Sequence, residues 1–255
     1  MSKLSKTKIE EYLPNLQNTE IYVFDTIDST NSEAKRRINS GFSSDGIFVA
    51  EHQTEGRGRR GKSFFSPANS GLYFTALLHP NTSIEDTVGI TAATAVVVTE
   101  VLERITKKHP KIKWVNDIFI DNKKVCGILV EAVSDFEANI NKAVIIGIGI
   151  NLTTEAFPED IKETAGNIGT MPDKNLLSAE LFKGLKSICK ELAERKFMDK
   201  YREKSLILNK TITFCRNGIN YTATATDILN DGSLKVHTDT GETLYLNSGE
   251  ISIKL

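Results

Sequence analysis

The segment from Gly56 to Ser63, Gly-Arg-Gly-Arg-Arg-Gly-Lys-Ser, restricts the folds open to this chain more than any other part of the sequence. It matches both G-x-G-x-x-G, the dinucleotide fingerprint, and G-x-x-x-x-G-K-[ST], the phosphate loop of nucleoside triphosphatases. Both folds need a helix directly after the glycines, because the helix N-terminus holds the phosphates. The residues that follow, 64–71, include Pro67 and Asn69 and do not favour a helix. The sequence therefore predicts neither fold.

The same segment favours the binding of an anion. Four positive charges and three glycines lie within its first seven residues, so backbone amides and guanidinium groups can surround a phosphate or carboxylate closely. We interpret residues 54–71 as a long loop, and loops of this length inside a compact domain are usually functional or disordered. A solvated charge run is the alternative, and nucleic-acid phosphate is a competing anion. Because 32 basic residues stand against 33 acidic ones, for a net charge of -1, no overall field attracts nucleic acid.

The first 200 residues mix antiparallel-looking strands with helices, which predicts an α+β domain. Thr30 and Glu33 predict a capping box at the start of one helix, Ser178 predicts the cap of another, and residues 121–123 predict a hairpin turn. The expected strands cover residues 21–27, 47–52, 72–79, 112–115, 118–120, 125–133 and 143–150, and the first two helices cover 30–39 and 87–107.

The pattern changes after about residue 208. Short alternating strands follow one another there, separated by the turn signals Asn217-Gly218, Asp231-Gly232 and Thr240-Gly241. Strands of this length and spacing predict a small β-barrel. We therefore expect two domains, 1–207 and 208–255.

Composition narrows the class of protein. With 255 residues, 40% of them hydrophobic, the chain can build a sizeable core. No apolar run approaches the length of a membrane span, and the N-terminus has no signal-peptide core. The three cysteines are odd in number and widely spaced, as expected for reduced thiols in the cytoplasm. No spacing of residues predicts a metal site.

Three further clusters have both a functional and a structural interpretation. In the first, Asn116, Asp117 and Lys124 could face one side, where the lysine neutralises an anion and the aspartate serves as a base for an amine; turn formation is the alternative. The second is Ser29-Thr30-Asn31, which is by default a helix cap. The third is residues 147–151, in which a buried strand ends in a polar residue, Asn151. Outside these clusters, Trp114 is expected in the core.

Taken in order, five segments resemble the motifs of biotin protein ligases. The family pattern is Ser-Thr-Asn, Gln-x-x-Gly-Arg-Gly-Arg, Lys-Trp-Pro-Asn-Asp, Lys-hydrophobic-x-Gly-Ile-Leu-x-Glu and Gly-x-Gly-hydrophobic-Asn. The matching segments of this chain are 29–31, 53–59, 113–117, 124–131 and 147–151. The C-terminal strands are similar to the family's SH3-like domain. The resemblance implies a mixed, mostly antiparallel sheet with helices on one face, as in class II synthetases, capped by a small barrel.

By this resemblance, the enzyme uses MgATP to convert biotin to biotinyl-5'-AMP and then transfers biotin to a lysine of a carboxylase's biotin carboxyl carrier protein. Lys124, Arg59 and Asp117 would be catalytic, with Lys124 neutralising charge and Asp117 orienting or deprotonating the acceptor lysine. The implied biotin-binding residues are Ser29, Thr30, Asn31, Gln53, Gly56, Arg57, Arg59, Lys124 and Gly127, where Gly127 leaves room for the ligand. The implied nucleotide-binding residues are Arg59, Arg60, Lys62, Phe64, Asn116 and Asn151. Closing the Arg-rich loop of residues 56–63 would keep water away from biotinyl-5'-AMP, which is a reactive mixed anhydride.

The chain departs from the family pattern at two positions and in length. Val115 replaces the usual proline, and Phe64 stands where Trp is common and is expected to pack on the biotin ring. Only 28 residues precede Ser29, so we expect a monofunctional ligase that binds no operator DNA. The sequence leaves the oligomeric state open, with a homodimer as one candidate, and it leaves the magnesium ligands unknown.

Two other functions remain as alternatives. A lipoate protein ligase shares the fold and the adenylate chemistry, but its glycine-rich loop usually differs from residues 56–59. A nucleic-acid-binding module that uses the Arg-rich loop comes from a different class of protein. It would bind with a steep salt dependence and would leave Lys124 and Asn151 unexplained.

Overall fold

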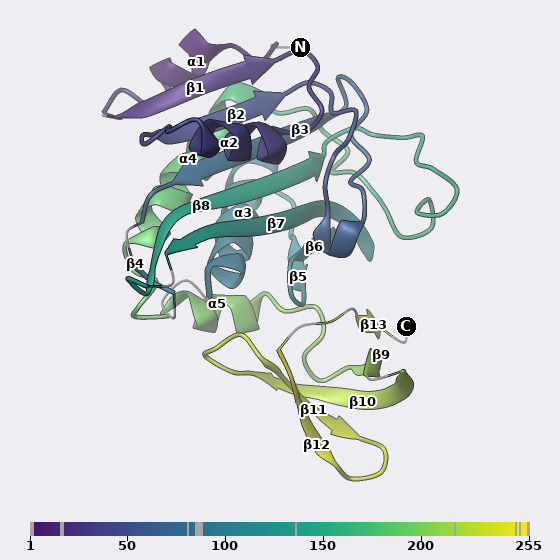
Figure 1. Cartoon of the computed structure of the whole chain (residues 1–255). Coiled ribbons are helices and arrows are strands. Elements are labelled where there is room, and N and C mark those ends of the chain that lie inside the picture. Colours follow the sequence, from purple (N-terminus) through teal and green to yellow (C-terminus); the bar gives the residue numbers. More distant parts are fainter. Residues whose placement is uncertain are drawn as a thin grey trace.

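The computed structural model describes residues 3–15, 18–80, 82–84, 89–135, 137–216, 218–247, 249 and 251–253. These residues form a large mixed sheet with helices on both of its faces and a small second sheet near the C-terminus (Figure 1). The helices are α1 (Lys6–Glu11), α2 (Thr30–Asn39), α3 (Ile90–Thr106), α4 (Lys174–Cys189) and α5 (Phe197–Glu203), with a 3-10 turn, η1, at Arg59–Gly61.

The large sheet has the strand order β1-β2-β3-β8-β7-β6-β5, and β4 pairs with β8 beside this path. Among the pairings between the described strands of this sheet only β1–β2 is parallel, so the expected mixed, mostly antiparallel sheet is confirmed. The strands are β1 (Thr19–Phe24), β2 (Asp45–Ala50), β3 (Gly71–Leu78), β4 (Thr82–Ser83), β5 (Lys111–Lys113), β6 (Asp117–Ile120), β7 (Lys123–Asp135) and β8 (Ile140–Asn151).

Helices cover both faces of this sheet, whereas the sequence predicted helices on one face. Because side chains alternate along a strand, Ile47 and Val49 of β2 join the main core with α3 and α4. Phe48, between them, joins a smaller core on the other face with Ala34 of α2 and Leu77 of β3. Figure 1 shows α2 in front of the sheet, with α3 and α4 behind it. The longer helices therefore follow the prediction and α2 is the exception.

Two predicted helix caps are wrong. Ser29 caps α2 by accepting a hydrogen bond from the backbone N–H of Ser32 at 3.4 Å, so Thr30 is the first helical residue and not half of a capping box. Asp173 caps α4, and Ser178 lies inside that helix, where its hydroxyl donates to the Lys174 carbonyl at 2.7 Å. The predicted helix start at 87 lies outside the described residues.

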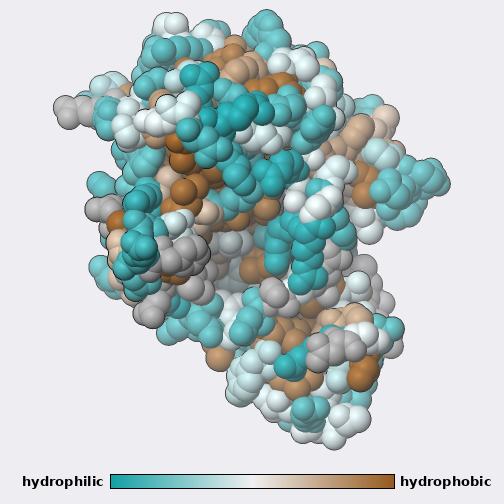
Figure 2. Space-filling model, viewed as in Figure 1, coloured by the Kyte–Doolittle hydropathy of each residue, from teal (hydrophilic) through white to brown (hydrophobic). Residues whose placement is uncertain are grey.

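The C-terminal strands form a five-stranded antiparallel sheet of order β12-β11-β10-β9-β13. Gly218, Gly232 and Gly241 adopt φ between 79° and 86° at the three predicted turns, which is the left-handed region that glycine favours; Asn217 lies outside the described residues. The strands are β9 (Thr211–Arg216), β10 (Ile219–Ile228), β11 (Leu234–Thr238), β12 (Thr243–Leu246) and β13 (Ile251–Ile253). In the space-filling view this lobe projects from the larger body (Figure 2).

Hydrogen bonds connect the two lobes. The indole N–H of Trp114, which is 3% exposed, donates to the Gly232 carbonyl at 2.9 Å. Arg202 of α5 donates to the Ile228 carbonyl at 2.8 Å. Trp114 is therefore a core residue, as predicted, and it also joins the lobes. Within the described part of the chain, no helix is both long and apolar enough to cross a membrane.

Candidate functional site

A cavity of about 380 Å³ opens where β3, β6, β7 and β8 meet the loop that precedes β3. This volume is within the usual range for small-molecule sites. Residues from the C-terminal sheet, Ile251 and Ser252, also line it. All but one of the predicted site residues line this cavity, namely Ser29, Thr30, Asn31, Gln53, Arg57, Arg59, Arg60, Lys62, Phe64, Asn116, Asp117, Lys124, Gly127 and Asn151.

Gly56 is the predicted residue that does not line the cavity. It is buried inside the loop, where an added Cβ would lie 2.3 Å from the Phe64 carbonyl oxygen and 2.5 Å from Ser66 Oγ. Gly56 therefore lets the two arms of the loop approach each other. It shapes the loop from behind the cavity wall.

The loop of residues 56–63, here the Gly/Arg loop, folds back on itself. Gly58 N–H donates to the Lys62 carbonyl at 2.7 Å, Phe64 N–H donates to the Gly56 carbonyl at 2.8 Å, and η1 forms the tip. No α-helix follows before β3, so the prediction that excluded the phosphate-loop and dinucleotide folds is confirmed. The cationic side chains of Arg57, Arg59 and Arg60 reach the cavity from this loop.

The Phe64 ring packs against two glycines of the large sheet, Gly127 and Gly149. Gly127 of β7 and Gly149 of β8 are direct cross-strand neighbours. An added Cβ would lie 3.1 Å from the Phe64 ring at Gly127 and 2.4 Å from it at Gly149. The prediction that Gly127 leaves room for a ligand therefore needs correction, because its space holds the Phe64 ring, which then forms part of the cavity wall.

A chain of hydrogen bonds lies at the neutral end of the cavity. Gln53 Oε1 accepts from the backbone N–H of Thr30 at 2.9 Å and from its hydroxyl at 3.1 Å. Gln53 Nε2 donates to Ser66 Oγ at 3.0 Å. Since an amide nitrogen carries two hydrogens, Gln53 can offer a second N–H to a ligand. Ser29 as a residue is 2% exposed, and it borders the same space.

The opposite end of the cavity is cationic. Lys124 Nζ lies 2.7 Å from Asp117 Oδ1, and both side chains are partly buried. Arg59 donates to Asn116 Oδ1 at 2.9 Å, and Asn116 in turn donates to the Ile128 carbonyl at 2.8 Å. The predicted cluster of Asn116, Asp117 and Lys124 is therefore assembled in the fold, with Arg59 added to it from a distant loop.

Asn151 has a free acceptor at this end. It is 4% exposed, and its Nδ2 donates to the Gly166 carbonyl at 3.0 Å. Its Oδ1 is buried and has no hydrogen-bond partner among the described residues. Leaving such an acceptor unpaired costs about 1–3 kcal/mol, so a ligand that donates a hydrogen bond there would relieve the cost.

Burial determines the protonation of three groups near the cavity. Burial raises the pKa of the Cys126 thiol well above its usual range, and the carboxylate of Asp117 adds to the shift. Burial likewise raises the pKa of Tyr73 and of Tyr201. Cys126 stays a neutral thiol near pH 7, which does not favour a thiolate nucleophile at this site.

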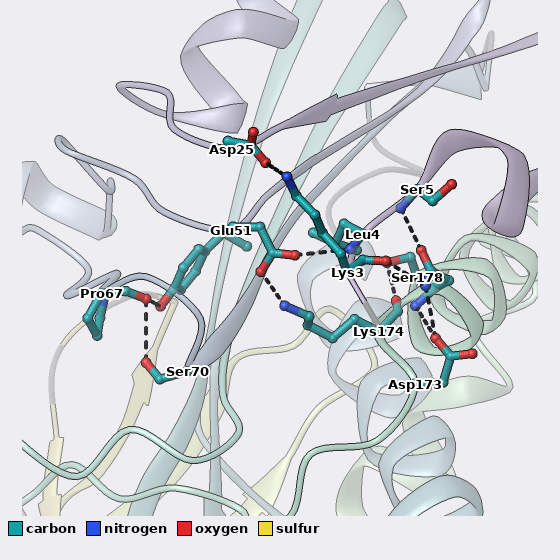
Figure 3. A network of polar contacts seen from close by, with 12 residues as sticks. Lys3, Leu4, Ser5, Asp25, Glu51, Pro67, Ser70, Asp173, Lys174 and Ser178 are labelled. Carbon is teal, nitrogen blue, oxygen red and sulfur yellow. Dashed lines mark hydrogen bonds and ion pairs between the residues drawn. The ribbon is translucent and has the colours of Figure 1, made fainter. Parts of the chain in front are cut away.

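A buried polar network supports the strand that leads into the site (Figure 3). Glu51 follows β2 and precedes Gln53 by two residues, and its carboxylate pairs with Lys174, with both side chains at most 7% exposed. The same carboxylate accepts from the backbone N–H of Leu4 at 3.0 Å, and Ser5 N–H donates to Asn175 Oδ1 at 2.8 Å. Breaking a buried ion pair by removing one partner typically costs about 3–5 kcal/mol, so this network holds the start of the loop firmly.

Two protein-family models match this chain, and one of them covers most of the cavity wall. The model of the Biotin/lipoate A/B protein ligase family matches residues 23–151, which hold most of the cavity wall. The model of the Biotin protein ligase C terminal domain matches residues 207–254. The chain belongs to the biotin/lipoate A/B protein ligase family.

Individual relatives of this ligase-family chain agree. It is 32% identical over 190 residues to the Bifunctional ligase/repressor BirA of Salmonella typhimurium, a match that covers 73% of the chain and 58% of that relative. It is 26% identical over 235 residues to the Biotin--[acetyl-CoA-carboxylase] ligase of Mycobacterium tuberculosis, covering 88% of the chain and 85% of the relative. The biotin protein ligase of Aquifex aeolicus, solved in complex with biotin and ATP, superposes with a TM-score of 0.75 at 28% identity, covering 92% and 98% of the two chains.

Sequence reasoning missed two residues of this biotin/lipoate ligase-family site. Thr75 of β3 is fully buried, with its Oγ1 2.8 Å from Thr30 Oγ1 and 2.7 Å from Asn31 Oδ1. Glu131 of β7 contacts Arg57 and Asn31. A threonine in an apolar strand carries no sequence signal of such a role. Glu131 could have been found as the last position of the fourth motif.

The site of this family member has few candidate metal ligands. The described residues contain no group of three or more His, Cys, Asp or Glu side chains that could hold a metal ion. Mg²⁺ often binds through phosphate oxygens and water with only one or two carboxylates. The donor set is therefore compatible with magnesium that enters together with ATP.

Proposed function

We propose that this protein is an ATP-dependent ligase that converts biotin to biotinyl-5'-AMP and transfers biotin to a lysine of a biotin carboxyl carrier protein or domain. One observation carries the proposal: a single cavity joins a neutral end with hydrogen-bond donors to a cationic end. Biotin has this polarity, because its ureido ring is neutral and its valerate carries a carboxylate. Family membership and the cavity volume support the same assignment.

At the neutral end, Ser29, Thr30 and Gln53 bind the ureido ring. The second amide N–H of Gln53 and the hydroxyl of Ser29 are donors suited to the ureido oxygen. A buried polar site discriminates strongly against a ligand that cannot pair with it. The dithiolane ring of lipoate would leave these donors unpaired, so the site favours biotin over lipoate.

At the cationic end, Lys124 and Arg59 neutralise charge while a carboxylate oxygen of biotin attacks the α-phosphorus of ATP. The bond between the α-phosphorus and the bridging oxygen breaks, and pyrophosphate leaves with the electron pair. Positioning and charge neutralisation are what this reaction needs. Asn151 Oδ1 accepts from the nucleotide, and Arg60, Lys62, Phe64 and Asn116 complete the nucleotide site.

In the second step the amine of the acceptor lysine attacks the acyl carbon of biotinyl-5'-AMP. The bond from this carbon to the phosphate oxygen breaks, and AMP leaves with the electron pair. Asp117 orients the amine and takes its proton, and its position 2.7 Å from Lys124 supports this role. The closed Gly/Arg loop keeps water from the mixed anhydride.

We further propose that residues 1–207 form the catalytic domain and 208–255 a C-terminal domain that completes the cavity rim. We place the reaction in the cytoplasm, because Cys126 and Cys189 are buried free thiols.

The test is ATP–pyrophosphate exchange with the purified protein, supplying biotin and lipoate separately. Exchange with biotin alone supports the proposal, and exchange with lipoate alone moves the assignment to a lipoate ligase. A folded sample that exchanges with neither contradicts both. A nucleic-acid-binding function would then be tested by the salt dependence of binding to duplex and single-stranded probes.

A further inference from the structure

We propose that Glu131 is a positioning residue that latches the Gly/Arg loop over the cavity through Arg57. The two guanidinium nitrogens Nη1 and Nη2 of Arg57 each donate to one carboxylate oxygen of Glu131, both at 3.0 Å. This two-pronged geometry fixes direction as well as distance. Residues 74 positions apart thus connect the start of the loop to β7.

Glu131 also orients the polar groups at the neutral end. Asn31 Nδ2 donates to Glu131 Oε2 at 3.2 Å. Because an ionised carboxylate only accepts, Asn31 must present its amide nitrogen to Glu131 and its Oδ1 to the hydroxyl of Thr75, 2.7 Å away. Gly147 permits this arrangement, since an added Cβ there would lie 2.2 Å from Asn31 Oδ1.

Hydrogen bonds also connect Thr30 to the other arm of the loop through Gln53 and Ser66. Thr30 donates to Gln53 Oε1 from its backbone N–H at 2.9 Å and from its hydroxyl at 3.1 Å, and Thr75 Oγ1 lies 2.8 Å from the Thr30 hydroxyl oxygen. Gln53 donates to Ser66, whose hydroxyl donates to the Phe64 carbonyl at 2.9 Å. Hydrogen bonds therefore tie both arms of the loop to the adjacent residues Thr30 and Asn31, one arm through Gln53 and the other through Glu131 and Arg57, and Glu131 is the only carboxylate in this set among the described residues.

The exposure of the pair argues for positioning more than for stability. The side chains of Arg57 and Glu131 are 40% and 23% exposed, and ion pairs in such surroundings add little to global stability. A pair of this kind can still change how often a mobile loop opens, since local opening is governed by the few contacts of the segment itself. Glu131 therefore acts on the closed population of the loop.

Limited proteolysis with trypsin tests the latch without depending on the proposed function. The loop offers Arg57, Arg59, Arg60 and Lys62 as cleavage sites. We expect Glu131→Gln to raise the rate of cleavage within residues 57–62 by about fivefold, which is the upper end for a partly exposed ion pair. Glu180→Gln is the matched control, because Glu180 is 21% exposed and pairs with Arg104 at 2.5 Å between α4 and α3, away from the cavity.

A charge swap keeps the test decisive even if a single variant is damaged. The double variant Arg57→Glu with Glu131→Arg rebuilds the pair in reverse, so loop cleavage at Arg59, Arg60 and Lys62 should be slower than in either single variant. The latch is overturned if Glu131→Gln leaves loop cleavage unchanged, if Glu180→Gln accelerates it equally, or if the swap protects no better than the single changes.

A kinetic measurement connects the latch to the reaction and rests on the proposed function. Glu131→Gln should raise the KM for biotin in ATP–pyrophosphate exchange about fivefold while kcat stays within about twofold, because the residue acts on loop closure and touches no reacting atom. A loss confined to kcat contradicts the positioning role. If the unmodified protein shows no exchange, the proposed function fails, whereas the proteolysis result still decides the latch.

Discussion

Replacing Gly149 with alanine tests whether the Phe64 ring forms the wall of the cavity. The new Cβ would lie 2.4 Å from Phe64 Cε1 and 2.7 Å from Cζ, whereas carbon atoms pack at about 3.5–4.0 Å. Gly149 pairs with Tyr73 on β3 and with Gly127 on β7, so the backbone of β8 is held on both sides. The ring must therefore move by about 1 Å, and such overpacking typically costs about 1–3 kcal/mol.

We expect Gly149→Ala to lower the free energy of unfolding by about 1–3 kcal/mol and to weaken biotin binding about tenfold, since the displaced ring enters the cavity. Urea unfolding followed by the fluorescence of Trp114, the single tryptophan, gives the stability, and titration calorimetry gives the affinity. Gly127→Ala is the graded comparison. Its Cβ would lie 3.1 Å from the same ring, so both effects should be smaller.

A double variant tests whether the clash with Phe64 causes the loss of stability in Gly149→Ala. In a Phe64→Ala background the ring is absent, so adding Gly149→Ala should cost almost nothing, and the two changes should couple by at least about 1 kcal/mol. If Gly149→Ala destabilises equally in both backgrounds, the clash with Phe64 is not its cause. If Gly149→Ala is silent by itself, the described ring position is wrong.

Three further predictions follow from partners and burial. Lys124→Ala should slow ATP–pyrophosphate exchange about 100- to 1000-fold. It should change the free energy of unfolding by no more than about 1 kcal/mol, because the ion pair of Lys124 with Asp117 is partly exposed. A large loss of stability in urea unfolding would show that Lys124 is structural. Cys215 is exposed, whereas burial raises the pKa of Cys189 to about 12 and raises the pKa of Cys126 as well. A disulfide reagent at pH 8 should therefore modify one thiol in the native protein and three in urea. A second thiol that reacts fast in the native protein would contradict the described burial. Arg36 beside Asp28 lowers the pKa of that carboxyl to about 2. Its stabilisation is therefore present above about pH 4 and lost as the pH falls toward 2, so Asp28→Asn should destabilise by less than about 1 kcal/mol at pH 7 and the difference should shrink between pH 4 and 2; a constant difference in urea unfolding would refute the assignment.

Features that depend on neighbours in the sequence were largely predictable. Asp121 and Asn122 adopt φ of 50° and 60° and connect β6 to β7, as the hairpin signal predicts. The absence of a helix after the Gly/Arg loop was read from Pro67 and its neighbours. The caps at Thr30 and Ser178 failed, because several Ser, Thr and Asp side chains near one helix start compete and packing selects among them.

The residues of the site were predictable from the sequence, whereas several of their contacts were not. Ordered motifs in the sequence identified the residues that surround the cavity, because residue type and local spacing carry that chemistry. The sequence alone did not reveal that Phe64 fills the space above Gly127, that Thr75 and Glu131 complete the polar chain, or that α2 covers the opposite face of the sheet. Those facts depend on strand register and on which side chains alternate toward each face. Residues such as Arg57 and Glu131 meet only after the sheet has formed, so the sequence by itself determined the chemistry available to this protein, and only the tertiary structure decided how that chemistry is arranged and held.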